Sequence, residues 1–241
     1  DYVQLLKNNG IRVVNFEDFG SGVSYADLVI NELYDEPTIP GKNIFWGRGY
    51  FFVREEFEAT RPNCFKPKVE RVLLTFGGTD QHNLSELIYD HIKDLCKKHA
   101  AFIHIVTGPG YRNYHALKKK VSREGDASIT HSTGVISRIM ADAQIAITSN
   151  GRTVYELAHM NVPTVVIPQH ERERTHSFAI KEHGFIPMDT YKKGVTEELV
   201  CKVLEPLLTA TSYRLKLFKK MTQFSFQGNK KTVLDEILRL I

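Results

Sequence analysis

The central part of the chain alternates short apolar runs with longer segments in which apolar residues return every three or four positions. The apolar runs predict strands near 71–76, 101–107, 127–131, 144–148 and 162–167. The periodic segments predict helices near 84–99, 113–121, 134–141, 152–160 and 175–183. Such an alternation of strands and helices indicates a parallel sheet that is covered by helices on both faces.

The two ends of the chain are less regular than its centre. Residues 2–9 have the pattern of the end of a helix, and they are followed by predicted strands over 11–16 and 27–30 and by a helix or turn near 51–57. We therefore expect the first strand and helix of this part to precede the sequence. Toward the other end, periodic segments predict helices over 196–208, 212–222 and 232–240.

A domain boundary is expected within residues 60–68, where Pro62 and Pro67 give the chain the composition of a linker. The expected organisation has three parts. They are the remnant of an amino-terminal Rossmann-like domain over 1–62, a nucleotide-binding Rossmann-like domain over 63–228, and a carboxyl-terminal helix over 229–241.

Composition excludes several classes of protein. The 241 residues carry a net charge of +4 and ten histidines, which suits an anionic small ligand, and the one tight basic run, 118–120, is not interleaved with aromatic residues as nucleic-acid binding favours. The sequence has no apolar run of membrane-spanning length and no secretory signal, so we expect a cytoplasmic protein. Cys64, Cys96 and Cys201 lack metal-ligand spacing, and no cofactor or metal is expected.

The stretch 147–168, ITSNGRTVYELAHMNVPTVVIP, predicts a strand, a tight turn, a short helix with one acidic residue, and a second strand. Backbone N–H groups of Ser149, Asn150 and Gly151, and of the helix that opens at Thr153, would face a phosphate. Glu156, one helical turn further on, would accept hydrogen bonds from ribose hydroxyls. The alternative is an ordinary turn followed by a solvated glutamate.

The loops that follow the other predicted strands belong to the same edge of the sheet. In Gly77-Gly78-Thr79-Asp80 the glycines permit a close approach of the backbone to a diphosphate, while Asp80 or Asn83 is expected to cap the next helix. Gly108, after the next strand, forms either a second wall of the crevice or a plain turn.

Two further loops contain candidate ligand contacts. The backbone of Val135 and Ile136 is placed to pair with the edge of a base, although these residues fit a capped helix start equally well. The charged loop 169–176 offers Gln169, Thr175 and His176 as contacts to a sugar, and its arginines either clamp a phosphate or pair with adjacent acids. No GxSxG elbow of a serine hydrolase is present.

Three segments together resemble the GT-B nucleotide-sugar enzymes, and most closely the UDP-sugar hydrolase of pseudaminic acid biosynthesis with its spore-coat polysaccharide relatives. They are VLLTFGGTD at 72–80, ADAQIAITSNGRTVYELAHMNVPTVVIP at 141–168, and ADLVINEL at 26–33 with WGRGYFFVREEF at 46–57. The resemblance implies a GT-B-like α/β fold in which one complete Rossmann-like parallel-sheet domain follows the tail of another.

The same resemblance implies roles for the loop residues. Gly77 and Gly78 would face the diphosphate, 149–151 the phosphate at the helix start, Glu156 the ribose, and 135–136 the base. In these hydrolases a glycine-rich loop at the start of the amino-terminal domain carries the histidine that activates water, and this sequence begins after that point.

A second departure is that Thr175-His176 stands where the family has an Asn-Gln pair near the sugar. His176 is thereby the one candidate for a catalytic base within the chain. The expected function is nucleotide-sugar binding in a hydrolase of nonulosonic acid or surface polysaccharide biosynthesis, which cleaves the sugar–phosphate bond with water. The alternatives are part of a GT-B glycosyltransferase, or a non-catalytic nucleotide-sugar-binding module of a longer polypeptide.

Overall fold

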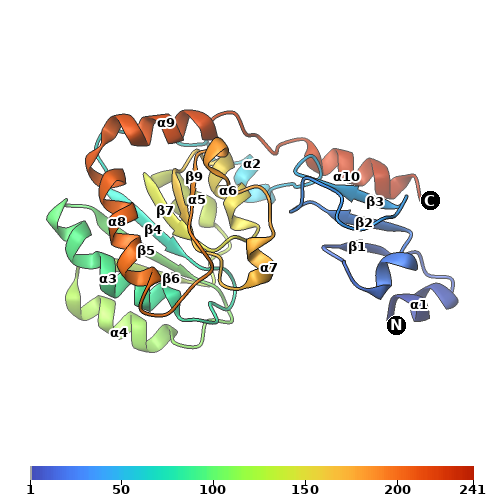
Figure 1. The fold of residues 1–241 in the computed structure, drawn as a ribbon, viewed down its shortest axis with the longest axis horizontal. Helices are drawn as coiled ribbons and strands as arrows, with labels where there is room; N and C mark the ends of the chain where they lie inside the picture. Colours follow the sequence, from blue (N-terminus) through green and yellow to red (C-terminus); the bar gives the residue numbers. More distant parts are fainter. Residues whose placement is uncertain (1) are drawn as a thin grey trace. The chain divides into compact units, whose positions relative to one another are not determined.

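The structure is a computed structural model that describes residues 2–241 (Figure 1). The described chain divides into two compact units. The first contains residues 2–54, His176–Phe178 and Phe226–Ile241, and the second contains Glu55–Thr175 and Ala179–Ser225. The expected organisation placed the boundary at residue 62 and treated 229–241 as a separate helix. The structure instead groups 55–62 with the second unit and the terminal helix with the first.

The second unit is built on a six-stranded sheet in which every pair of neighbouring strands is parallel. Its strands are β4 (Arg71–Thr75), β5 (Phe102–Thr107), β6 (Ala127–His131), β7 (Ile145–Thr148), β8 (Thr164–Val166) and β9 (Phe185–Pro187). Their order is β6-β5-β4-β7-β8-β9 (Figure 1). The chain moves outward from β4 to β6 and then returns beside β4 with β7, so the direction of winding reverses between β4 and β7.

Helices connect these strands, as parallel neighbours require. The connecting helices are α3 (Leu84–Lys98), α4 (Tyr114–Glu124), α5 (Ile136–Asp142), α6 (Thr153–His159), α7 (Glu171–Arg174) and η2 (Lys181–His183). Helix α2 (Glu55–Glu58) precedes β4, and α8 (Thr196–Thr209) and α9 (Thr211–Met221) follow β9. Helix α3 packs against α8 and β5, while α5 contacts β4 and α6 contacts β7 and β8.

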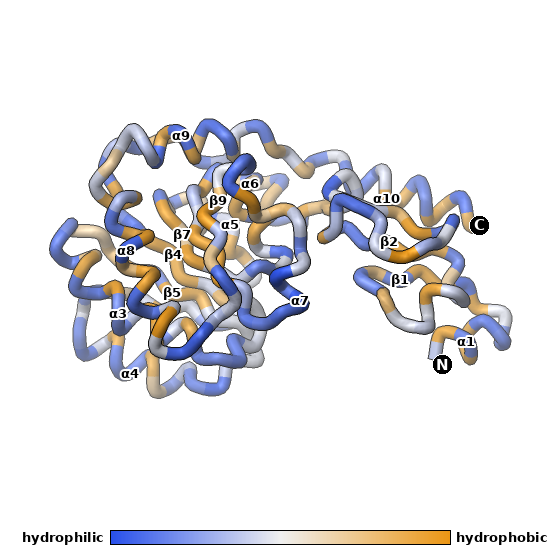
Figure 2. Tube along the Cα trace, viewed as in Figure 1, coloured by the Kyte–Doolittle hydropathy of each residue, from blue (hydrophilic) through white to orange (hydrophobic). Residues whose placement is uncertain are grey.

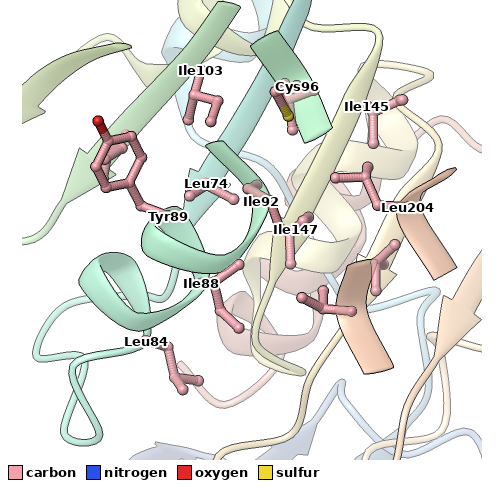
Figure 3. Close-up of a cluster of buried hydrophobic side chains, with 14 of the residues drawn as sticks. Leu74, Leu84, Ile88, Tyr89, Ile92, Cys96, Ile103, Ile145, Ile147 and Leu204 are labelled. Carbon is pink, nitrogen blue, oxygen red and sulfur yellow. The ribbon is translucent and has the colours of Figure 1, made fainter. Parts of the chain in front are cut away.

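A large hydrophobic cluster of the second unit joins the sheet to the helices α3, α4, α8 and α9. Side chains of α3 that are spaced four residues apart, Leu84, Ile88 and Ile92, are fully buried there, as the amphipathic pattern of this segment predicts. Figure 3 shows them together with Leu74, Ile103, Ile145 and Ile147 from the strands and Leu204 from α8. This core holds β4 and β7, whose carboxyl ends carry the loops described below.

The first unit has a three-stranded parallel sheet of β1 (Val14–Phe16), β2 (Leu28–Asn31) and β3 (Ile44–Trp46), in that order. Its helices are α1 (Tyr2–Asn8), η1 (Ser21–Ser24) and α10 (Asn229–Leu238). Val29 packs in a cluster with Val3 and Leu6 of α1, whereas Leu28 and Ile30 share a cluster with residues of α10. Successive residues of β2 thus serve opposite faces, and apolar residues are concentrated on the strands of both sheets (Figure 2).

The prediction of a helix over 175–183 is wrong. The structure has α7 at Glu171–Arg174 and η2 at Lys181–His183, with extended chain between them. The backbone N–H of Ser177 donates to the carbonyl of Leu33 at 3.1 Å, and Ser177 Oγ accepts from the N–H of Asp35 at 2.8 Å. These partners replace the intrahelical hydrogen bonds that a helix would need.

Most of the other predicted elements are confirmed within a few residues at each end, including the five central strands. Strands β3 and β9 were not predicted, and each has three residues, too few to show a period. The α/β class with one complete Rossmann-like parallel sheet is confirmed. Within residues 2–241 no helix has both the length and the apolar character that crossing a membrane requires.

Arg214 ties the segment before β4 to the end of α8 and provides a test of the fold. Its side chain is 1% exposed, and its guanidinium donates to the carbonyls of Leu207, Lys66 and Pro67. Replacing Arg214 with Ala would leave three carbonyls without these donors, and we expect a loss of about 2–4 kcal/mol in the free energy of unfolding. Urea denaturation would measure this loss. The exposed Lys216→Ala, on the same helix, should change stability by less than about 0.5 kcal/mol.

Candidate functional site

A pocket of about 340 Å³ lies in the second unit where the chain leaves the carboxyl ends of β4, β7 and β8. Because the winding reverses between β4 and β7, their loops turn away from each other and leave a crevice. The lining residues come from three loops: Phe76, Gly77, Gly78, Thr79 and Gln81, then Ser149, Gly151, Arg152 and Thr153, and finally Gln169, His170 and Glu173.

The loop after β4 contains three residues with left-handed backbone conformation. Gly77 has φ +76°, a region that glycine enters without strain, while Asp80 has φ 44° and Asn83 has φ 57°. The Asp80 carboxylate accepts hydrogen bonds from the backbone N–H groups of Leu84 at 2.7 Å and Ser85 at 2.8 Å. Asp80 therefore caps α3, and Asn83 instead donates to Glu86 Oε2 at 3.0 Å.

Asp80 is 5% exposed and does not line the pocket of about 340 Å³. Desolvation by burial raises the pKa of its carboxyl, against the opposing effect of the hydrogen bonds that it accepts. A second pocket, of about 390 Å³, shares Thr79 with the first, and Asp80, Tyr111 and Arg112 are among its lining residues. The hydrogen bonds that Asp80 accepts from the start of α3 indicate that its role is to fix the loop.

Gly108 supports the β4 loop from behind. A Cβ atom at this position would lie 2.4 Å from the Cα of Gly78 and 2.5 Å from its carbonyl oxygen. The N–H of Gly110 donates to the same carbonyl at 2.9 Å. Gly108 does not line the pocket, so of the two expectations for this loop, wall or plain turn, the structure shows a backing layer for Gly77 and Gly78.

The loop after β7 brings Ser149, Gly151 and Thr153 to the pocket. Ser149 is 4% exposed, and α6 begins at Thr153. Asn150 lies between Ser149 and Gly151 in the sequence but does not line the pocket. Its Nδ2 donates to the carbonyl of Glu173 at 2.7 Å. Asn150 thus joins the loop after β7 to the loop after β8.

The loop after β8 is joined to both of the others. Gln169 Nε2 donates to the carbonyl of Phe76 at 3.1 Å, and the N–H of Gln169 donates to Glu173 Oε2 at 2.7 Å. Gln169 is 9% exposed, and among the described residues its Oε1 has no hydrogen-bond partner. The three loops therefore form one braced rim, with an acceptor atom of Gln169 at the wall of the pocket.

His170 and Glu173 complete this wall, and the sequence analysis did not identify them. His170 is the N-cap of α7, and its Nδ1 accepts a hydrogen bond from the N–H of Glu173 at 3.3 Å. The Glu173 carboxylate returns to the N–H of Gln169, so the pair forms a reciprocal cap. The spacing His170-x-x-Glu173 carried this signal, because it has the form of a capping box with histidine in the place of serine or threonine.

Several residues expected at the site lie outside this pocket. Glu156 is half-buried on the first turn of α6, three residues beyond Thr153. Val135 is 47% exposed and is the N-cap of α5, where its side chain makes no capping hydrogen bond, and its N–H donates to Thr133 Oγ1 at 3.1 Å. Ile136 is 8% exposed.

Thr175 and His176 do not line the pocket either. Thr175 Oγ1 donates to the carbonyl of Arg172 at 2.7 Å, which closes α7. His176 belongs to the first unit, where its ring lies 5.3 Å from the ring of Tyr34, nearly perpendicular to it. Arg174 pairs with Glu171 at 3.5 Å on the surface, as the salt-bridge alternative for this loop predicted.

Of the expected contacts, the structure brings seven together at one pocket: Gly77, Gly78, Thr79, Ser149, Gly151, Thr153 and Gln169. Across residues 2–241 no group of three or more His, Cys, Asp or Glu side chains is arranged to hold a metal ion. A doubly wound parallel sheet with a crevice at its reversal point, lined by glycine loops, defines the Rossmann-like class of α/β proteins.

Within this class, the chain belongs to the glycosyltransferase family 28 C-terminal domain family, whose model matches residues 72–235. It is 27% identical over 193 residues to the uncharacterized protein MJ1062 of Methanocaldococcus jannaschii, covering 69% of this chain and 40% of the relative. It is 23% identical over 218 residues to the spore coat polysaccharide biosynthesis protein SpsG of Bacillus subtilis, covering 86% and 63%. The chain thus spans less than two thirds of the length of these relatives.

Solved structures show the same fold. MurG of Acinetobacter baumannii superposes with a TM-score of 0.64 at 16% identity, covering 98% of this chain and 70% of MurG. The Anabaena protein Alr3699/HepE, in complex with UDP and glucose, gives a TM-score of 0.62 at 9% identity, covering 98% of this chain and 74% of that one. The resemblance to GT-B nucleotide-sugar enzymes is confirmed.

The close approach at Gly108 leads to a prediction. In Gly108→Ala the added methyl group would collide with the backbone of Gly78, and because the neighbour is backbone, one of the two loops must move. We expect the free energy of unfolding to fall by about 1–3 kcal/mol. Chemical denaturation would measure the loss.

Gly49→Ala is the matched control, because a Cβ there meets nothing within 4 Å and its φ is not positive. Its stability should stay within about 0.5 kcal/mol of the parent protein. Equal stabilities for the Gly108 and Gly49 variants would show that the two loops are not packed as described.

Proposed function

We propose that this pocket binds the diphosphate of a nucleotide-sugar, with a UDP-sugar as the expected ligand. The observation that carries the proposal is the convergence of the Gly77-Gly78 loop and the 149–153 segment on one pocket at the reversal point of the sheet. Membership of the glycosyltransferase family 28 C-terminal domain family supports it. The name of SpsG, which refers to polysaccharide biosynthesis, and the UDP and glucose complex of the Anabaena protein point the same way.

In this proposal the backbone at Gly77 and Gly78 approaches the diphosphate, since neither residue has a side chain in the way. Ser149 and Thr153 supply hydroxyl groups, and Gly151 leaves room beside them. Glu156 lies on the same face of α6 as Thr153, because residues three apart on a helix are neighbours. It is the proposed partner of the ribose hydroxyls, and the 135–136 backbone is the proposed partner of the base.

Hydrolysis of the sugar–phosphate bond is the proposed reaction of the whole protein, in nonulosonic acid or surface polysaccharide biosynthesis in the cytoplasm. Water would attack the anomeric carbon, and the nucleoside diphosphate would leave with the bonding electrons. Glycosyl transfer to an acceptor hydroxyl is the second candidate, and the match to a glycosyltransferase family favours it. A non-catalytic nucleotide-sugar module is the third. Release of free sugar without any acceptor would separate hydrolysis from the other two.

Calorimetric titration of the 241-residue chain with UDP, CMP and GDP tests the binding proposal. We expect saturable binding that is tightest for UDP. Gly151→Val should weaken it at least tenfold, because the new side chain enters a pocket-lining position. A Cβ there meets no protein atom within 4 Å, so we expect the fold to remain intact.

Gly49→Val is the control, since Gly49 is equally open but lies in the first unit. It should bind UDP like the parent protein. The proposal fails if the parent protein shows no binding at millimolar concentrations of any of the three nucleotides.

Glu156→Ala tests the ribose contact. Loss of charge-assisted hydrogen bonds to ribose hydroxyls should weaken UDP binding by about 1–3 kcal/mol. Binding of 2′,3′-dideoxy-UDP, which lacks these hydroxyls, should be equally weak in the parent and in the variant. A parent protein that binds UDP and its dideoxy form equally well would show that Glu156 has no such role.

A further inference from the structure

His170 is the one histidine that lines the pocket of about 340 Å³ within the described chain. Its side chain is 49% exposed, and it is fixed at one end because Nδ1 accepts the hydrogen bond from the N–H of Glu173. The family resemblance directed attention to His176, which lies in the first unit. The proposed function above gives no role to the side chain of His170.

The cap decides which ring nitrogen carries the proton. A neutral imidazole has one N–H donor and one bare acceptor nitrogen. Since Nδ1 accepts from a backbone N–H, the acceptor is Nδ1 and the proton lies on Nε2. A backbone amide cannot change roles, so the surrounding structure fixes this tautomer.

Within residues 2–241 the Nε2–H group has no hydrogen-bond partner. The nearest acidic oxygen, Glu173 Oε1, lies 4.0 Å from Nε2, which is too long for a hydrogen bond. The other oxygen, Oε2, is occupied by the N–H of Gln169 at 2.7 Å. A hydrogen-bond donor therefore lies at the wall of a pocket that the glycine loop also lines.

We propose that His170 Nε2–H donates a hydrogen bond to the diphosphate of the bound nucleotide and positions it against the loop of Gly77 and Gly78. This inference rests on the proposed function of the pocket. The ring does not act as a base at Nε2, because that nitrogen already holds a proton, and a proton on Nδ1 would break the cap of α7. His170 thus stabilises the group that leaves rather than activating the group that attacks.

Two substitutions separate the role of Nδ1 in the cap from the role of Nε2 as a donor. In His170→Asn the side-chain oxygen can occupy the place of Nδ1, and asparagine is a favourable N-cap, so the cap is kept while the distal donor is lost. In His170→Gln the amide N–H can occupy the place of Nε2, so the donor is kept while the cap is weakened. The exposed His115→Asn, outside the pocket, is the control.

The full 241-residue chain would be titrated with UDP and with uridine, and its thermal unfolding followed. We expect His170→Asn to weaken UDP binding about tenfold, the effect of one charge-assisted hydrogen bond, with uridine binding and the unfolding temperature unchanged. His170→Gln should bind UDP within about threefold of the parent, because it keeps the donor, but unfold at a lower temperature.

A spectroscopic measurement reports on the tautomer directly. Long-range ¹H–¹⁵N correlation spectra of the parent protein should show His170 protonated at Nε2 and bare at Nδ1 at neutral pH. The opposite tautomer would overturn the proposal, and so would unchanged UDP affinity in His170→Asn or an equal loss of UDP and uridine binding. A parent protein that binds no nucleotide would refute the proposed function itself, a result distinct from these.

Discussion

The site depends on a contact between two backbones. At Gly78 and Gly108 the loops after β4 and β5 approach so closely that not even a methyl group fits between them. The position of the glycine loop is thereby set by excluded volume and by the hydrogen bond from Gly110, rather than by side chains that can change rotamer. The pocket that Gly77 and Gly78 line therefore has one wall whose position is fixed.

The rest of the pocket is held by hydrogen bonds that run between loops. Gln169 donates to the carbonyl of Phe76, and Asn150 donates to the carbonyl of Glu173, so the loop after β8 is joined to the loops after β4 and β7. These bonds use side-chain amides to satisfy loop carbonyls. A ligand with several acceptor oxygens meets a surface that is already ordered, and binding need not spend free energy on loop closure.

The sequence predicted the second unit better than the first for a physical reason. Segments such as 84–99 bury one continuous stripe of apolar side chains, so their periodicity in the sequence reflects their packing. Once the strands are placed, the glycine turns after β4 and β7 can be recognised by their position in the sequence. The segment at Ser177 could not be read in this way, because its partners, Leu33 and Asp35, are more than 140 residues away. His170 was missed because its role comes from a cap whose usual residues are serine or threonine.

The return of His176–Phe178 and of α10 to the first unit makes the chain cross between the units four times. A fragment cut at the linker would keep the strands that define the family, but it would separate Phe226 from Phe51 and Val233 from Leu28 and Ile30. The region that matches the family model is therefore not a self-contained domain. Exchange of this region between proteins during evolution would require the recipient to supply the same packing partners for His176–Phe178 and for α10.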